Sequence, residues 1–410
     1  MIGFIGLFIF ICTLLYYLIL IILFKVKSKF WYIQPCYHFY DLHYILYKNQ
    51  VIQKGLPKIN SFVSFEKVLT YPPEDIHEKT FNYIIELLRN EYYHTKDASY
   101  KPTTQSILPY LFKNFHNSYI SLAINPTYTP STDNNNIIKY NDIIGCIMSK
   151  SICITIHSDE FYSYYVDFFC IKKEYRKLGY SEIMIQSHEY SNRMKTKEIQ
   201  VHLFKREGEL TGIVPIVSYD TQLFHLPDLI NQSIPSTFLY NIKDTINTQS
   251  PILIQITKTN IYLIFDYLKS VKETKQFSFM ATTNISNIIE LIESKNIFCF
   301  VLLYCHQIYA SYFLKNTYME IEEKQCLSCF ASIKDKSYDT YITEYSFYQT
   351  FLQILLITGK FSFLFIENIS HNHLLIKETS GLSLSTSKSA YFFYNYIFQP
   401  VKPKEVFIFI

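Results

Sequence analysis

The sequence lacks the short motifs that identify several large enzyme classes. It contains no Walker-type phosphate loop, no Gly-x-Ser-x-Gly nucleophile elbow and no dinucleotide-binding glycine fingerprint. It also lacks a strong excess of one charge, because 38 Lys and Arg against 35 Asp and Glu give a net charge of only +3. Such a balance provides no general attraction for nucleic acid, so we expect no nucleic-acid partner.

Cysteine is sparse, with nine residues that are scattered and odd in number. This pattern favours reduced thiols in a cytosolic setting over a disulfide framework. Cys326 and Cys329 form one Cys-x-x-Cys, with Cys305 and His306 upstream, so a zinc site is one interpretation. A structural zinc site needs four ligands, and no second Cys-x-x-Cys exists. We therefore favour two buried thiols near a strand and expect no metal.

The chain does contain ample material for folded cores. It has 410 residues, of which 49% are hydrophobic and 18% aromatic. This length accommodates two domains of ordinary size, and the composition argues against disorder.

The first uncharged stretch, residues 2–24, is almost wholly apolar and long enough to cross a bilayer as a helix. A signal peptide is the alternative, but the basic start, the short apolar run and the small-residue cleavage site are missing. Lys25, Lys27 and Lys29 follow directly. The positive-inside rule then predicts a single-pass anchor, residues 1–24, with the body of the protein on the cytoplasmic side of a membrane.

The most informative stretch is residues 164–193. Its first part is rich in aromatic and β-branched residues and predicts a buried strand, and its last part predicts an amphipathic helix. Between them lies a basic turn that ends at Gly179, so that free N–H groups at a helix start can hold phosphate. The turn Arg-Lys-Leu-Gly-Tyr-Ser, residues 176–181, resembles the pyrophosphate-binding loop of the GNAT acyltransferases.

The predicted order of elements is a helix, an antiparallel meander, a bulged central strand, a phosphate-type loop, a helix and a strand. Short strands at 143–148 and 152–156 are expected to form a hairpin through the turn 149–151. The second half repeats the theme without the basic loop. We therefore predict an α+β (α/β) fold with mixed sheets, built of two fused GNAT-like halves at 25–230 and 231–410.

Several stretches together resemble the N-myristoyltransferases (glycylpeptide N-tetradecanoyltransferases), in order along the chain. They are Lys-Phe-Trp-Tyr-Ile-Gln-Pro at 29–35, Asn-Glu-Tyr-Tyr at 90–93, the run 167–176, Leu-Thr-Gly-Ile-Val-Pro at 210–215, His225, Ser-His-Asn at 370–372, and the segments 391–396 and 405–410.

The resemblance implies roles for named residues. The backbone N–H groups of Phe168 and Phe169 would form an oxyanion hole for the thioester of acyl-CoA. The main-chain carboxylate of Ile410 would be the base that deprotonates the substrate's N-terminal glycine, with Thr211 orienting the amine. A carboxylate in such apolar surroundings should be more basic than in water.

The resemblance also implies binding residues for both substrates. Myristoyl-CoA, the co-substrate, would contact Phe30, Trp31, Cys170, Ile171, Arg176, Lys177, Leu178, Gly179, Tyr180 and Ser181. The peptide would contact Tyr93, Asp167, His225 and Asn372.

The sequence departs from the family pattern at some of these positions. Asp167 stands where the family has Asn, the basic loop is thinned to Arg-Lys-Leu-Gly, and a transmembrane segment is unusual for the family. The sequence therefore predicts an acyl-CoA-dependent enzyme that acylates N-terminal glycine. The alternatives are a GNAT acetyltransferase with a short acyl donor, and an inactive membrane-bound scaffold or virion component of the same fold.

Overall fold

The computed structural model describes residues 2–46, 49–95, 97–125, 127, 137–208, 212–233, 251–304, 306–335, 344–379 and 381–410. The described helices are α1 (Ile2–Lys27), α2 (Lys29–Tyr32), α3 (Glu78–Glu91), α4 (Thr104–Leu111), α5 (Tyr180–Lys195), α6 (Leu226–Ser233), α7 (Ile261–Glu273), α8 (Ile285–Glu293), α9 (Glu344–Ile357) and α10 (Asn372–Glu378).

The strands of the first half are β1 (Gln50–Val51), β2 (Val68–Tyr71), β3 (Ala98–Tyr100), β4 (Tyr119–Ile124), β5 (Ile143–Ile156), β6 (Asp159–Ile171), β7 (His202–Glu207) and β8 (Val217–His225). Those of the second half are β9 (Ile252–Gln255), β10 (Phe279–Thr282), β11 (Ile297–Tyr304), β12 (Gln307–Ile321), β13 (Lys324–Lys334), β14 (Phe363–Glu367), β15 (Ser385–Tyr394), β16 (Tyr396–Ile397) and β17 (Val406–Phe409).

One mixed sheet of 15 strands runs through both halves of the chain, in the order β17-β10-β5-β6-β7-β15-β8-β14-β13-β12-β11-β9, with β2, β3 and β4 paired at its sides. Three of its pairs are parallel, namely β10 with β17, β6 with β7 and β13 with β14. Strand β15, from near the end of the sequence, is thereby inserted between β7 and β8 of the first half, and β17 pairs with β10, which itself pairs with β5 of the first half. The fold is α+β with a mixed sheet, and the division into halves at 230 and 231 remains a prediction.

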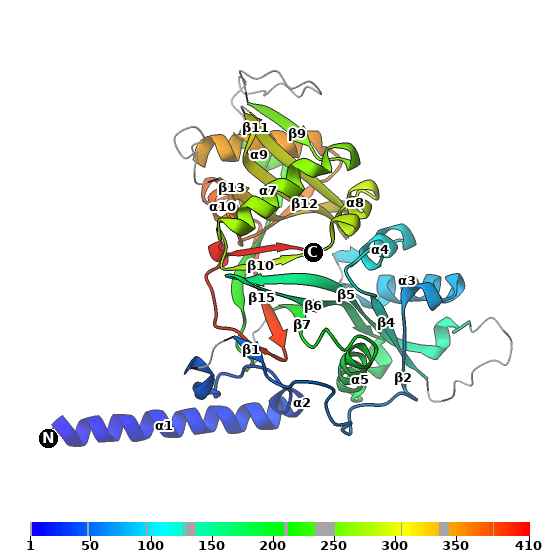
Figure 1. Ribbon diagram of the computed structural model, residues 1–410, viewed down its shortest axis with the longest axis vertical. Coiled ribbons are helices and arrows are strands. Elements are labelled where there is room, and N and C mark those ends of the chain that lie inside the picture. The colour runs from blue at the N-terminus through cyan, green and yellow to red at the C-terminus, as the bar shows by residue number, and fades with distance from the viewer. Residues whose placement is uncertain are drawn as a thin grey trace.

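The last strand lies in the interior of the molecule rather than at its surface (Figure 1). Phe407 and Phe409 of β17 are fully buried and pack on Phe313 of β12. The same apolar core contains residues of α3, α4, β5 and β10, and it includes Ile410 as a partly buried member. Burial of large aromatic rings is the strongest favourable contribution available to a strand of this length, and it brings the end of the sequence to the centre of the fold.

Most elements expected from periodicity are confirmed. The helix expected after the basic turn is α5. Periodicity also predicts a strand at 297–304 and a helix at 345–358, and the structure has β11 and α9 there. The preferred interpretation of Cys326 and Cys329 agrees as well, since both thiols are fully buried in β13. The polar residues at 127–136 also predict a surface loop, and this stretch lies almost entirely outside the described residues.

The hairpin expected at 149–151 is wrong, because β5 continues unbroken from Ile143 to Ile156. The polar residues that suggested a turn are buried and have partners on neighbouring elements. Ser149 accepts a hydrogen bond from Asn192 of α5 at 2.9 Å, and Ser151 accepts one from the N–H of His116. The real turn lies after Ile156, where His157 has a φ of 54°.

Helix α1 projects away from the body as a single rod (Figure 1). Among the described residues it alone is long and apolar enough to cross a membrane, with a mean hydropathy of 2.9 over Phe4–Lys27. Its last turns touch the body: Phe24 is buried against Phe39 and Tyr40, and the hydroxyl of Tyr17 donates to the carbonyl of Phe39 at 3.2 Å. Gly212 leaves room for the Phe24 ring, since an added Cβ would lie 2.6 Å from two of its atoms.

Candidate functional site

A bulge in β6 shapes the centre of the site. Two residues, Phe168 and Phe169, lie between Asp167 and Cys170, whereas a single residue separates their partners on β5. Phe168 has a φ of 52°, in the left-handed region that residues with a Cβ rarely adopt. Such bulges bend a strand and redirect its backbone groups, often beside a functional site. The bulge expected in the central strand is therefore present at Phe168.

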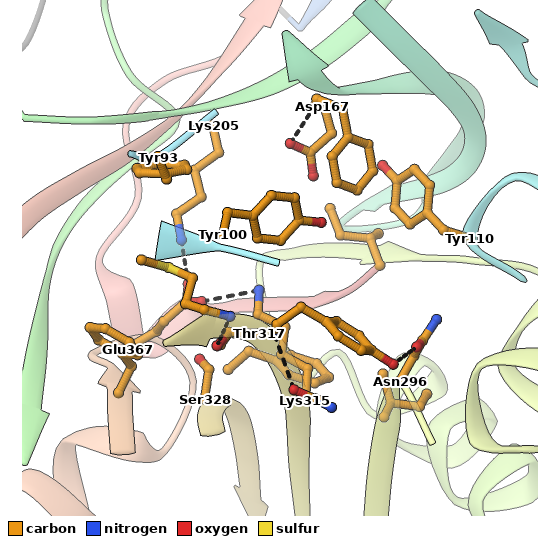
Figure 2. Close-up of a pocket in the computed structure, with 18 of the residues that line it drawn as sticks. Tyr93, Tyr100, Tyr110, Asp167, Lys205, Asn296, Lys315, Thr317, Ser328 and Glu367 are labelled. Atoms are coloured by element: carbon orange, nitrogen blue, oxygen red, sulfur yellow. Dashed lines mark hydrogen bonds and ion pairs between the residues drawn. The ribbon is translucent and has the colours of Figure 1, made fainter. Parts of the chain in front are cut away.

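A cavity of about 310 Å³ opens beside the bulge. Its walls come from the end of α3, from β3, α4, β6 and β7, and from β12, β13, β14 and β15 of the second half, so that residues remote in sequence meet there (Figure 2). Residues that line it include Tyr92, Tyr93, Tyr100, Tyr110, Asp167, Phe168, Lys205, Lys315, Ser328, Glu367 and Ile410. Of the residues predicted from the sequence, the structure thus brings Tyr93, Asp167, Phe168 and Ile410 together around one space.

The position of Ile410 follows from the pairing of the strand that precedes it. β17 lies parallel to β10, with Phe409 opposite Thr282, and the N–H of Thr283 donates to the carbonyl of Phe409 at 3.0 Å. Ile410 then extends one residue beyond the last paired position and lines the cavity. Its backbone is held by the sheet rather than by a loop.

A buried ionic cluster forms another part of the wall (Figure 2). Glu367, at the end of β14, lies 3.1 Å from the Lys205 ammonium and 3.4 Å from that of Lys315, and accepts a hydrogen bond from Tyr219 at 2.7 Å. Burial alone would raise the pKa of Glu367, but the two ammonium groups and the Tyr219 hydroxyl outweigh it and lower the pKa to about 2. The carboxylate therefore stays ionised and holds both lysines against the wall.

Asp167 is the second acidic side chain of the cavity. Its Oδ1 accepts hydrogen bonds from the backbone N–H of Phe168 at 2.8 Å and from the hydroxyl of Tyr92 at 3.2 Å. Burial raises the pKa of this carboxyl above its ordinary value, although the Phe168 N–H, Lys315, Tyr92 and Lys205 all act in the opposite direction. Asp167 thus holds the same N–H that the sequence resemblance assigns to an oxyanion hole.

Tyrosines surround the Phe168 ring. The rings of Tyr92, Tyr100 and Tyr110 lie 6.1, 6.4 and 5.2 Å from it between centroids. Burial raises the pKa of each of these three hydroxyls, so they remain neutral groups that can donate hydrogen bonds. Tyr93, the residue expected to contact peptide, is partly exposed beside them, with a φ of 45°.

Lys150 lies buried behind the aromatic wall. Its Nζ is 4.2 Å from the centroid of the Tyr110 ring and 3.3 Å from Oδ1 of Asn287. Burial lowers the pKa of this lysine to about 7, against the attraction of Asp167 and with a smaller contribution from Lys315. No acidic partner is recorded within ion-pair distance of Lys150 in the described part of the chain.

The basic turn, residues 176–181, precedes α5 as expected. Gly179 is the N-cap residue with a φ of 83°, which suits glycine, and no side chain caps the first turn of α5. Arg176 does not point freely to solvent, because its guanidinium binds the carboxylate of Glu91 at 2.8 Å and the carbonyl of Ile171 at 2.9 Å. Lys177 and Leu178 are exposed, and Tyr180 and Ser181 are half-buried.

The remaining residues expected to contact acyl-CoA are packed by protein side chains. Trp31 stacks on Phe204 at 5.7 Å, and the buried Phe30 lies against Phe62 at 5.2 Å. Cys170 and Ile171 are buried at the end of β6.

Two residues expected to contact the peptide, Asn372 and His225, are not among the described residues that line the cavity, and the position of a third, Thr211, is not described. Asn372 is fully buried and donates to the carbonyls of Glu367 and Cys329, which fixes the backbone that carries Glu367. His225 pairs with Asp228 at 2.8 Å at the end of β8. Thr211 lies outside the described residues, so its role remains a prediction.

Sequence reasoning missed Lys205, Lys315 and Glu367. A carboxylate at the end of the apolar strand Phe363–Glu367 was a visible signal, because a charged residue continuing a buried run needs a partner. The two lysines lie on other strands, and periodicity cannot tell which distant cation meets which anion.

Comparisons by sequence find no relative: no protein-family model and no curated protein matches this chain. Comparison of structures gives a different result. The N-myristoyltransferase of Saccharomyces cerevisiae with bound myristoyl-CoA matches with a TM-score of 0.66 and 11% identity, over 92% of this chain and 94% of that one. A second structure of that enzyme with myristoyl-CoA gives a TM-score of 0.67 and 12% identity, over 92% and 90% of the two chains.

A third, with myristoyl-CoA and inhibitors, gives a TM-score of 0.65 and 12% identity, over 93% of this chain and 94% of that one. The chain therefore has the fold of the N-myristoyltransferases at very low sequence identity. The expected likeness is confirmed at the level of the fold.

Proposed function

We propose that this protein is an acyl-CoA-dependent N-acyltransferase that moves a long acyl chain, such as myristoyl, to the N-terminal glycine amine of a peptide or protein. One observation carries the proposal. In a chain with the N-myristoyltransferase fold, the bulge at Phe168 and residue Ile410 line the same cavity although they are 242 positions apart in the sequence.

The bulge would provide the groups that activate the electrophile, which is the thioester carbonyl of acyl-CoA. Backbone N–H groups at Phe168 and Phe169 would donate to the thioester oxygen as negative charge develops there. Preorganised donors of this kind are often the largest single catalytic contribution, typically about 10²- to 10³-fold for one donor. The left-handed φ of Phe168 supports this role, because strained backbone at a bulge is a recurrent feature of catalytic sites.

The nucleophilic side needs a base, because an amine attacks only after it has lost a proton. The carboxylate of Ile410 would act as a base toward this nitrogen, with Thr211 orienting the amine. The amine nitrogen then bonds to the thioester carbon and loses a second proton, the carbon–sulfur bond breaks, and CoA leaves as a thiolate that takes up one of the two protons to become the thiol. The buried rings of Tyr100 and Tyr110 would limit access of water to this step.

The phosphates of CoA would lie at the start of α5. The uncapped N–H groups after Gly179 and the exposed ammonium of Lys177 suit an anion there. Because Arg176 is already paired with Glu91, Lys177 would contribute more to binding than Arg176. The division into an acyl-CoA half at 25–230 and a peptide half at 231–410 belongs to the same proposal.

Helix α1 would anchor the enzyme in a membrane with its body on the cytoplasmic side. A helix of 26 residues is about 39 Å long, which exceeds the hydrocarbon thickness of a bilayer. Its apolar side chains from Phe4 to Tyr16 are exposed all round, and Lys25 and Lys27 follow in its last turn. An anchored enzyme would release its lipidated product directly beside the membrane that the product enters.

The proposal is tested by incubating the full-length protein, in detergent or in bilayer discs, with alkynyl-myristoyl-CoA and a peptide that begins with glycine. We expect label on the peptide amine, and none on a matched peptide whose N-terminus is acetylated. A parallel reaction with acetyl-CoA tests the short-chain alternative, which requires acetyl transfer without myristoyl transfer.

A catalytically inactive scaffold is the second candidate. The bond from the Phe168 N–H to Asp167, and the pairing of Arg176 with Glu91, favour it, because both occupy groups that a substrate would need. An absence of transfer and of acyl-CoA binding, measured by the fluorescence of Trp31 and by calorimetry, would support the scaffold and contradict the enzyme.

A further inference from the structure

We propose that Asp167 is a proton-operated cap on the Phe168 N–H: it accepts the first proton of the incoming ammonium group and thereby releases that N–H for the thioester oxygen. The inference rests on the proposed acyl transfer and adds to it a specific control. The site would stay closed to the thioester until a peptide amine arrives.

The geometry of the carboxylate carries the argument. Both recorded hydrogen bonds of Asp167, from the Phe168 N–H at 2.8 Å and from the Tyr92 hydroxyl at 3.2 Å, go to Oδ1. Asp167 lies across the cavity from Lys315 and Ser328, and its second oxygen is turned toward the space between them (Figure 2). One oxygen thus holds the backbone donor while the other is offered to a ligand.

An ionised Asp167 is incompatible with an oxyanion at the same N–H. The N–H can donate one strong hydrogen bond, and the carboxylate already takes it at 2.8 Å. A second negative oxygen there would also be repelled by the first at close range in a buried site. A protonated carboxyl is a far weaker acceptor, so the bond to the N–H loosens once Asp167 is neutral.

The surroundings leave Asp167 without a direct cationic partner of its own. The titratable and charged groups around it are Tyr92, Tyr93, Tyr100, Tyr110, Lys150, Tyr165, Lys205, Glu207, Lys315, Glu367, Tyr391 and the carboxylate proposed at Ile410. Lys205 and Lys315 are both held by Glu367, and no ion pair of Asp167 is recorded in the described ranges. An ammonium group entering the cavity would be its first close cation.

The number of protons that leave the substrate nitrogen is consistent with two bases in the site. A substrate ammonium carries three protons and the product amide nitrogen carries one, so two protons must leave. In the proposed sequence R–NH₃⁺ gives the first to Asp167, the free amine attacks the thioester carbon, and the resulting R–NH₂⁺ gives the second to the carboxylate of Ile410. The CoA thiolate takes up one of them and the other passes to solvent, which balances the reaction.

The decisive variant is Asp167→Asn, which keeps the shape of the side chain and removes its charge. Myristoyl transfer is measured from pH 5.5 to 9 with the full-length protein in detergent, together with release of CoA in the absence of peptide. In the variant we expect transfer at pH 6.5 to fall by roughly 10²-fold, the usual size of a general-base contribution. The loss should diminish as pH rises through about 8, where a free α-amino group becomes available without a base. Peptide-independent CoA release should increase, because the N–H is no longer held by an anion.

A second variant, Tyr92→Phe, separates a titrating role from a merely structural one. The Tyr92 hydroxyl lowers the pKa of Asp167 by donating to its anion. Its removal should therefore move the acidic limb of the pH–rate profile to higher pH, while the carboxylate is retained. Asp159→Asn, an exposed site at the start of the same strand, should leave the profile where it is.

The results distinguish this inference from the function beneath it. Suppose that the wild-type protein transfers myristoyl, and that Asp167→Asn lowers the rate by the same factor at every pH without added CoA release. The proposed role of Asp167 is then wrong, and the proposed acyltransferase function is unaffected. An unmoved acidic limb in Tyr92→Phe would also overturn the cap. If the wild-type protein transfers nothing at any pH and binds no acyl-CoA, both proposals fail together.

Discussion

The backbone N–H of Thr283 donates to the carbonyl of Phe409 at 3.0 Å, and this bond sets the place of Ile410 at the cavity. Thr283 is itself held, because its single hydroxyl proton lies between two acceptors, Oδ1 of Asn287 at 2.9 Å and Oδ1 of Asn114 at 3.1 Å. A reactive group on this backbone is therefore positioned by the sheet and by the side chains of Asn287 and Asn114, which is the rigidity that a catalytic base requires.

Three residues added after Ile410 should abolish transfer while acyl-CoA binding is retained. The added chain replaces the proposed carboxylate by a neutral peptide group and fills part of the cavity. We expect a loss of at least about 10²-fold in kcat, as for removal of a general base. The same residues placed before Met1 serve as the control. Full activity of the extended protein would remove Ile410 from the mechanism.

Replacement of Glu367 by Gln should destabilise the protein. It leaves the Lys205 and Lys315 ammonium groups close together in a largely buried wall without their counter-ion. Breaking a buried pair by removing one partner typically costs about 3–5 kcal/mol. Chemical unfolding in urea checks this. Glu207→Gln is the matched control, because Glu207 lies 3.9 Å from the same Lys205 but is half-exposed, and should cost less than about 1 kcal/mol.

The same carboxylate predicts how stability responds to acid. Its pKa in the folded protein is about 2, below the ordinary value of 4.5, so its contribution is complete above about pH 4.5 and is lost as pH falls toward 2. Glu367→Gln should therefore show a weaker dependence of unfolding free energy on pH in that window. Parallel curves for the two proteins would contradict the assignment.

Lys150→Met should stabilise the protein at neutral pH. With a folded-state pKa of about 7 against an ordinary 10.5, Lys150 binds fewer protons in the folded than in the unfolded chain between these values. Wild-type stability should therefore rise as pH increases from 7 to 10.5, and the variant should lack that rise. A gain of about 1–4 kcal/mol near pH 7 is expected from replacing a buried charge by an apolar chain of similar volume. Exposed Lys139→Met provides the comparison.

Gly212→Ala should disturb the contact between α1 and the body. The added Cβ would lie 2.6 Å from ring atoms of Phe24, which is itself enclosed by aromatic neighbours and has little room to move. Overpacking of this kind typically costs about 1–3 kcal/mol. Phe24→Ala in the same protein should relieve much of the loss, whereas Gly6→Ala, in open space, should have no such effect. Thermal midpoints of the four variants complete the double-mutant cycle.

The sequence was sufficient where local pattern determines structure. The aromatic run before the basic turn predicted β6, and collinear short matches predicted the fold and a common place for Phe168 and Ile410. The pattern failed at Ser149, Lys150 and Ser151, because polar residues inside a strand resemble a turn unless their buried partners are known. Those partners, Asn192, His116 and Asn287, lie on distant segments.

The ionic cluster and the contacts of Asp167 could not be predicted from the sequence for a related reason. Glu367, Lys205 and Lys315 lie on three strands that are adjacent only after the sheet has formed. Asp167 was recognised as an added carboxylate, but its bond to the next residue's N–H depends on the side-chain rotamer and on the backbone conformation at the bulge. No periodicity encodes a single backbone angle.

Tyr17 and Phe24 lie two helical turns apart on α1, and both rest on Phe39. These contacts hold the second half of the helix against the body. If α1 spans a bilayer, as proposed, the contacts with Phe39 would orient the body relative to the lipid, and a polypeptide substrate would approach from the side that faces away from it.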